Sequence, residues 1–333
     1  MENIISGAVF GAGLTASGMY QPAVIMGQLK FESFHMIQVF LTATASSACL
    51  VAAAQKLGYI HLGPRSFSSV GLFAPYDGNI IGGFLLGSGM ILAGACPGTV
   101  LAQIGVGVRS GFYAFEGATV AGVLWSGFLQ RIMHCPAPVL RNGSGKDVAK
   151  KEEVLSVSQG LGVSPSTVLL GFEAACIAAI IAAATLTTLG PEAKISPVAG
   201  GLLICTAQFV SILLRKSLMG TSTSFEEVGD WFWGAFKGDS LPRRYNNLLF
   251  STGAVAGAFV LARIFPAVAQ VTEVTISPLT ASLGGFLMIL GSRIAGGCTS
   301  GHGISGMSLM SISSFVTIAA TFAGGTLVGL LMG

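Results

Sequence analysis

Charged side chains are scarce in this sequence of 333 residues: Asp, Glu, Lys and Arg together make up 9% of it, against about 25% in an ordinary soluble domain. A soluble protein of this length needs more charge than that to cover its surface. The scarcity therefore argues against a soluble enzyme, a nucleic-acid-binding protein and a disordered chain. Hydrophobic residues reach 52%, and the mean hydropathy is +0.76. The composition indicates a multi-pass membrane protein, in which lipid replaces water as the outer solvent.

Several sequence signals are missing as well. The six Cys residues follow no CxxC or Cys/His metal-binding spacing, so we expect neither a metal site nor a disulfide framework. Glu2 is the only charge before Lys30, and without a basic start no cleavable signal peptide is expected. No Walker A motif occurs, so we expect no ATP hydrolysis. We accordingly expect no cofactor and no enzymatic activity.

The sequence predicts an all-α polytopic membrane protein with about nine transmembrane helices and additional short broken or re-entrant helices. A transmembrane helix needs about 20 predominantly apolar residues. The first apolar run is short and rich in Gly and Ser, which favours a broken helix. Polar stretches at 134–167 and 215–245 are predicted to be solvated loops. The nine apolar runs are 4–20, 33–55, 78–95, 111–133, 168–189, 197–214, 246–265, 279–296 and 311–332.

The positions of Lys and Arg predict an orientation in the membrane. Nine spans place the loops at 56–77, 131–167 and 215–245 on the same side as the N-terminus. These loops hold twelve of the 17 Lys and Arg residues, the loops on the other side hold four, and Arg293 lies inside an apolar run. Because cytoplasmic loops carry the excess of basic residues, we expect a cell-membrane protein with a cytoplasmic N-terminus and an outside C-terminus.

Two segments of the chain resemble each other. Residues 82–96 read GGFLLGSGMILAGAC and residues 284–298 read GGFLMILGSRIAGGC, with eight of fifteen positions identical, including the final Cys. A helix-breaking stretch follows each. We therefore predict one membrane domain over 1–333, made of repeat one (1–133), a cytoplasmic loop and connecting helix (134–196), and repeat two (197–333). A single connecting span inverts the second repeat, so that Cys96 and Cys298 become pseudo-symmetric partners.

The residues at these breaks favour an anionic ligand. A broken helix exposes backbone N–H groups that bind anions, and small hydroxyl residues follow Cys298 and also occupy 220–224. Arg293 lies in an apolar run, where a charge is costly and is usually functional or paired. A protonated thiol is a weak donor and a soft acceptor, which suits a soft sulfur anion that must bind and then leave.

The segments 291–306 (GSRIAGGCTSGHGISG) and 92–99 (LAGACPGT) resemble the YeeE/YedE family of membrane proteins with a sulphur transport domain. The resemblance implies uptake of a small sulfur-containing anion, which is thiosulfate in the best-understood members. It further implies that thiols along a central constriction pass the ion by S–H···S contacts, at Cys96 and Cys298 here. Met19 stands where family members that carry thiosulfate have a third Cys, and Cys205 is an alternative third thiol.

The predicted function is transport of a thiosulfate-like anion, with two alternatives. One is a membrane thiol enzyme of the sulfurtransferase type, and the other is a non-transporting membrane subunit. The expected partners are a small inorganic sulfur anion and the lipid bilayer, with a sulfur-accepting protein as a further candidate and no nucleic acid. The candidate substrate-binding residues are Met19, Cys96, Pro97, Gly98, Thr99, Arg293, Cys298, Thr299, Ser300 and His302.

Overall fold

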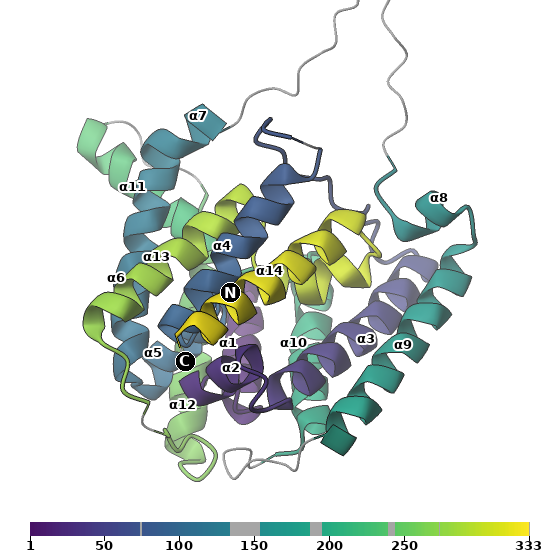
Figure 1. Ribbon diagram of the computed structural model, residues 1–333, viewed down its shortest axis with the longest axis horizontal. Coiled ribbons are helices and arrows are strands. Elements are labelled where there is room, and N and C mark those ends of the chain that lie inside the picture. Colours follow the sequence, from purple (N-terminus) through teal and green to yellow (C-terminus); the bar gives the residue numbers. More distant parts are fainter. Residues whose placement is uncertain (74, 134–153, 187–194, 239–243, 273, 333) are drawn as a thin grey trace, which may run out of the picture.

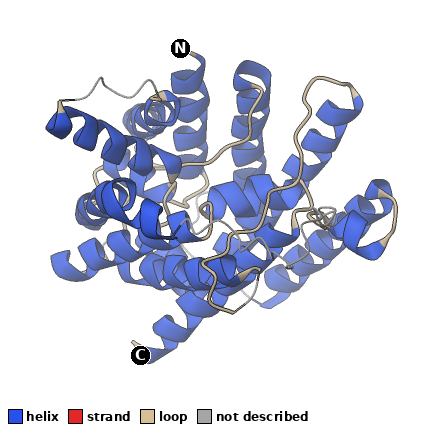
Figure 2. Ribbon diagram, turned by 90° about the horizontal axis from the view of Figure 1, so that it is seen from above, coloured by secondary structure: helices blue, strands red, loops and turns tan. Residues whose placement is uncertain are grey.

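The computed structural model describes residues 1–333 except 74, 134–153, 187–194, 239–243, 273 and 333 (Figure 1). Helices make up the ordered structure of the described residues, and Figure 2 shows no strand among them. The helices, with η1 and η2 of π type, are α1 (Glu2–Ala16), α2 (Pro22–Leu29), α3 (His35–Lys56), α4 (Asp77–Ala93), α5 (Thr99–Val106), α6 (Arg109–Leu124), η1 (Trp125–Leu129), α7 (Gln130–Met133), α8 (Val157–Leu161), α9 (Pro165–Leu186), α10 (Pro197–Arg215), α11 (Thr223–Lys237), α12 (Asn246–Ile264), α13 (Pro278–Ile294), η2 (Thr299–Gly306) and α14 (Ile312–Leu331).

Each of the nine apolar runs coincides with a helix, but the helices differ in length. Within the described residues, five are long and apolar enough to cross a membrane: α3, α9, α10, α12 and α14. The bent pair of α13 and η2, which meet at 47°, makes a sixth if it counts as one span. Helices α1, α4 and α6 have 15, 17 and 16 residues. The protein is thus an all-helical, multi-pass membrane protein.

The prediction of a solvated loop over 215–245 is wrong at 223–237, because α11 occupies these 15 residues in the middle of the stretch. One side of α11 carries Glu226, Glu227 and Asp230, whose carboxylates bond to neighbouring elements. Phe225, on the apolar side, is 2% exposed. Polar residues at helical spacing therefore make contacts inside the protein instead of facing water.

Helices α4 and α13 pack backbone to backbone through glycines. A Cβ added at Gly82 would stand 2.6 Å from the carbonyl oxygen of Gly291, and one added at Gly89 would stand 2.5 Å from that of Gly284. Only glycine permits so close an approach. The pairs run in opposite directions along the two chains, so the two helices cross antiparallel. This crossing brings the ends of the two resembling segments into one structure.

Two short chain breaks interrupt the helices at the ends of these segments. The first break is residues 94–98, between α4 and α5, and the second break is residues 295–298, between α13 and η2. Around them lies a buried apolar core that includes Phe10, Met90 and Met288 from α1, α4 and α13. The connecting helix α9 packs against α3 at the edge of the molecule (Figure 1) and is exposed over most of its length.

Candidate functional site

The first break is held by its own neighbouring residues. The backbone N–H of Cys96 donates to Oγ1 of Thr99 at 2.7 Å, and the N–H of Thr99 donates to Sγ of Cys96 at 3.4 Å. Pro97 and Gly98 form the bend between them. The sulfur thus satisfies one of the free N–H groups at the start of α5. The Cys96 side chain is partly exposed, so its thiol stays accessible from one side.

Gln103 of α5 also bonds to the first break. Its Nε2 donates to the carbonyl oxygen of Gly94 at 2.8 Å and to that of Tyr20 at 3.0 Å. A single amide therefore joins the end of α4 to the segment between α1 and α2. These contacts keep the first break close to Met19, the neighbour of Tyr20.

The second break places Cys298 in a small cluster of hydroxyl groups. Cys298 is 1% exposed. Its Sγ lies 3.2 Å from Oγ of Ser300 and 3.4 Å from Oγ1 of Thr221, and these two hydroxyl oxygens are 3.4 Å apart. Each hydroxyl can donate to the sulfur or accept from it. Thr221 comes from the segment between α10 and α11, so two distant parts of repeat two meet at this thiol.

The carbonyl groups at the end of α13 are satisfied by side chains that come from outside repeat two. Oγ of Ser68 donates to the carbonyl oxygen of Ile294 at 2.5 Å, and Nδ2 of Asn79 donates to that of Ala295 at 3.1 Å. A helix end leaves these last carbonyls without partners in the helix itself. Ser68, from the segment before α4, and Asn79, from the first turn of α4, thus cap the second break.

Arg65, from the same segment, reaches across the second break. Its Nη2 donates to the carbonyl oxygen of Gly296 at 3.0 Å, and its Nη1 donates to that of Gly301 at 2.6 Å. Burial lowers the pKa of its guanidinium, although an arginine side chain stays protonated in proteins. Arg65 thus lies in the loop that the sequence predicts at 56–77, with its guanidinium held against the second break.

His302 is buried beside the second break and faces away from the central cavity. Its Nε2 lies 3.0 Å from the carbonyl oxygen of Ala295 and its Nδ1 lies 2.9 Å from Oγ of Ser314. Because a carbonyl only accepts, Nε2 carries the proton and Nδ1 accepts from the Ser314 hydroxyl in the neutral ring. This geometry ties η2 to α13 and α14.

A small internal cavity of about 50 Å³ lies between the two breaks. Met19, Cys96 and Thr99 line it from one side, and Thr299 and Ser300 line it from the other. The rest of its wall is mostly apolar. The Oγ1 atom of Thr299 is buried without a hydrogen-bond partner, which leaves a free hydroxyl in the wall. A cavity of this size has room for a few water-sized groups.

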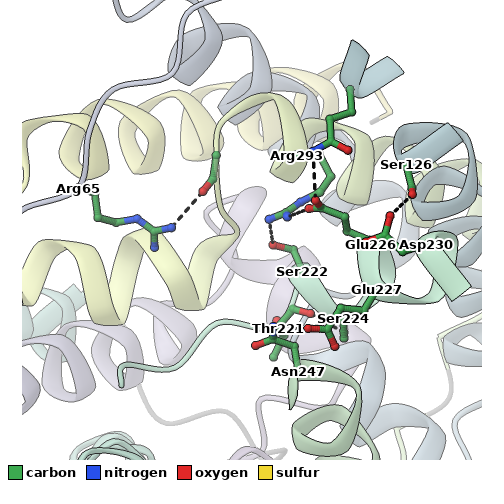
Figure 3. Close-up of polar contacts among 12 residues, drawn as sticks. Arg65, Ser126, Thr221, Ser222, Ser224, Glu226, Glu227, Asp230, Asn247 and Arg293 are labelled. Carbon is green, nitrogen blue, oxygen red and sulfur yellow. Dashed lines mark hydrogen bonds and ion pairs between the residues drawn. The ribbon is translucent and has the colours of Figure 1, made fainter. Parts of the chain in front are cut away.

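Arg293 lies outside the central cavity and is neutralised. Its Nη1 forms an ion pair with Glu226 of α11, and its Nη2 donates to Oγ of Ser222 at 2.8 Å (Figure 3). It also lines a separate pocket of about 190 Å³ with Ser68 and Ser69. The sequence left Arg293 as either functional or paired, and the structure gives it a carboxylate partner.

The structure thus brings most of the predicted residues together. Of the ten candidates, Met19, Cys96, Thr99, Thr299 and Ser300 line the cavity, and Cys298 lies directly behind Ser300. Cys205 is not among the cavity-lining residues found in the described part of the chain. Sequence reasoning missed Arg65 and Thr221. For Thr221, the hydroxyl-rich run at 220–224 was a sequence signal of a binding site. For Arg65, an arginine in a loop, the sequence gave no such signal.

Comparison with known sequences gives the class of protein. The chain belongs to the sulphur transport family, whose model matches residues 16–327. Both breaks and the helices from α2 to α13 lie within this match, as does most of α14, whereas α1, which supplies Phe10 and Leu14 of the cavity wall, lies almost entirely before it.

Among individual relatives, the chain is similar to the thiosulfate transporter TsuA of Spirochaeta thermophila. The two are 26% identical over 323 residues, which are 94% of this chain and 93% of that protein. Two proteins of Xylella fastidiosa, each named a probable transporter, are 32% and 31% identical over 137 residues. Those matches cover 41% of this chain and 93% of each Xylella protein.

Proposed function

We propose that this protein carries a small sulfur-containing anion, of the kind that thiosulfate represents, across the cell membrane. The observation that carries the proposal is the cavity between the two breaks, with Cys96 on one side and on the other Ser300, whose hydroxyl contacts the Cys298 sulfur. Membership of the sulphur transport family and the likeness to a thiosulfate transporter support it.

The proposed path runs from Cys96 through the cavity to Cys298. Protonated thiols donate S–H bonds to a terminal sulfur of the anion, and the hydroxyls of Thr99, Thr299 and Ser300 donate to its oxygens. Thiols bind an anion weakly enough to release it, which a transported ion requires. Met19 accepts but cannot donate, so the first thiol of the family pattern is absent here.

We further propose nine transmembrane spans arranged as two inverted repeats, with a cytoplasmic N-terminus. The antiparallel crossing supports this, because Gly82 and Gly89 of repeat one are equivalent to Gly284 and Gly291 of repeat two and contact them in the reverse order. The helix contacts agree: α1 with α12 matches α10 with α3, and α4 with α14 matches α13 with α6. Inverted repeats place a substrate site near the membrane midplane.

The energetics set a condition on uptake. Moving one charge against 100 mV costs about 2.3 kcal/mol, so a dianion that enters a negative cell faces about twice that cost. The proposed uptake therefore depends on a steep gradient, on a coupled ion or on rapid consumption inside the cell.

Two alternatives make different predictions. A sulfurtransferase-type membrane enzyme needs a nucleophilic thiol, so an activity that survives Cys298→Ser would exclude covalent chemistry there. It would also need a sulfur-accepting protein, which the transport proposal can use but does not require. A non-transporting subunit predicts that replacing Cys96 or Cys298 changes no solute flux.

The test is uptake of radiolabelled thiosulfate into proteoliposomes that contain the purified protein. We expect uptake above that of protein-free liposomes and competition by an excess of unlabelled thiosulfate. Absence of uptake by the wild-type protein would contradict thiosulfate transport. Uptake of labelled sulfate or sulfite in the same vesicles would then identify another anion as the substrate.

A further inference from the structure

The two arginines beside the second break differ in how their charges are compensated. The charge of Arg293 is neutralised by Glu226 (Figure 3). Arg65 donates only to the carbonyl oxygens of Gly296 and Gly301, and no carboxylate pairs with it within the part of the chain that the structure describes. Carbonyl groups offer partial charges, so Arg65 keeps a net charge of one.

This charge lies next to the Cys298 sulfur. A Cβ placed on Gly301 would stand 3.1 Å from Nη1 of Arg65 and 3.9 Å from Sγ of Cys298. A single glycine therefore separates the guanidinium from the thiol, and a larger residue would push them apart. Because the site is buried, the charge is screened less than it would be at the surface.

Arg65 is only partly exposed, and a cation so far removed from water without a counter-charge is unfavourable by itself. The protein keeps it beside the end of the cavity, where Ser300 and Thr299 also face inward. An anion at this position would remove the imbalance. Arg65 does not line the cavity itself, so it attracts an anion there without blocking the cavity.

We infer that Arg65 provides the positive charge that draws the sulfur anion to the second break and sets the preference for anions there. The inference rests on the proposed function. Arg293, which the sequence singles out, has the different role of holding α11 to the end of α13. Arg65 also bridges two carbonyls, so the test must separate its charge from this structural contact.

The experiment compares wild-type protein with Arg65→Gln, Arg65→Lys and the control Lys56→Gln. Lys56 is an exposed cation that ends α3 on the same side of the molecule. For each protein, the Kd of thiosulfate is measured by calorimetry in detergent, and KM and Vmax are measured from uptake into proteoliposomes. Melting temperatures verify that each variant is folded.

We expect Arg65→Gln to raise both Kd and KM at least tenfold, with a smaller change in Vmax. Arg65→Lys keeps the charge but cannot reproduce the planar two-carbonyl bridge, so we expect values within about threefold of wild type. Lys56→Gln should leave both constants unchanged. If Arg65→Gln does not fold, the Lys variant decides alone.

Two results would overturn the inference. A folded Arg65→Lys protein with a tenfold higher KM would assign Arg65 to the carbonyl bridge alone, and an Arg65→Gln protein with wild-type Kd would remove any role for its charge. A failure of the proposed function would give a different result from a failure of this inference. Wild-type protein that binds thiosulfate, with Kd sensitive to Arg65→Gln, but transports none would contradict transport and leave the inference intact.

Discussion

The two breaks follow similar sequence segments yet are stabilised in different ways. The first break is held mainly by nearby residues: Cys96 and Thr99 bond to each other, and Gln103 bonds to Gly94, nine residues away, as well as to Tyr20. The second break is held from a distance, since Ser68 and Arg65 reach it across more than 200 residues of sequence. The thiols differ too, because Cys96 is partly exposed and Cys298 is fully enclosed.

Because of this difference, we expect the two breaks to respond differently when other parts of the protein move. A locally held break keeps its shape whatever the rest of the protein does. A break held by side chains of another segment responds when that segment moves. We therefore expect substitutions that remove the distant contacts of the second break to cost more stability than those in the first.

The largest effect should come from Glu226→Gln. The change leaves the Arg293 guanidinium, whose side chain is 9% exposed, without its carboxylate partner. Because a broken buried ion pair costs about 3–5 kcal/mol and Glu226 is partly exposed, we expect a loss of about 3 kcal/mol in the free energy of unfolding, measured by SDS titration. The double variant Glu226→Gln with Arg293→Met should recover part of it. An unchanged unfolding curve for Glu226→Gln would show that the ion pair does not stabilise the second break.

Asn79→Leu should be the next most damaging. Nδ2 of Asn79 bonds to the carbonyl oxygen of Ala295 and, at 2.9 Å, to Oγ1 of Thr317, while its Oδ1 accepts from the N–H of Ser68. Leu has a similar size but makes none of these bonds, so we expect a loss of about 2–3 kcal/mol in the same titration. Asn3→Ala, at a partly exposed position near the N-terminus, serves as the control and should change stability by less than about 0.5 kcal/mol. Equal losses for both variants would mean that Asn79 of α4 does not hold the break.

Gln103→Leu tests the first break and should have the smallest effect. It removes two hydrogen bonds, but it also removes an Oε1 atom that is buried without a partner. We therefore expect a loss of about 1 kcal/mol. A loss larger than that of Asn79→Leu would reverse the order of the two breaks and contradict the division between local and distant support.

Much of the fold could be predicted from the sequence. Apolar runs locate nine helices, because in a membrane the helix must satisfy its own backbone and therefore be continuously apolar. Glycines next to Cys96 and Cys298 locate both breaks. The repeated segment predicts Cys96 and Cys298 as partners along one path, and in the structure Cys96 lines the cavity while Cys298 contacts Ser300 of the opposite wall.

The remaining features depend on contacts between distant residues. In the sequence, Arg65 does not differ from other loop cations. Its role depends on the segment before α4 lying over the end of α13. The acidic residues of α11 favour a solvent-exposed loop when they are read from composition. Glu226 and Asp230 are nevertheless at helical spacing, and their carboxylates bond to Arg293 of α13 and Ser126 of η1. Composition alone does not distinguish a solvated charge from a charge that is paired inside the protein.

The most direct test of a path through both breaks is thiosulfate uptake by four single variants measured together. Cys96→Ala and Cys298→Ala remove the thiols at the two breaks. Cys49→Ala and Cys205→Ala are matched controls, because neither side chain lines the cavity. We predict at least a tenfold loss of uptake for the first two and at least half of the wild-type rate for the controls. Wild-type uptake by both Cys96→Ala and Cys298→Ala would contradict a path along these thiols.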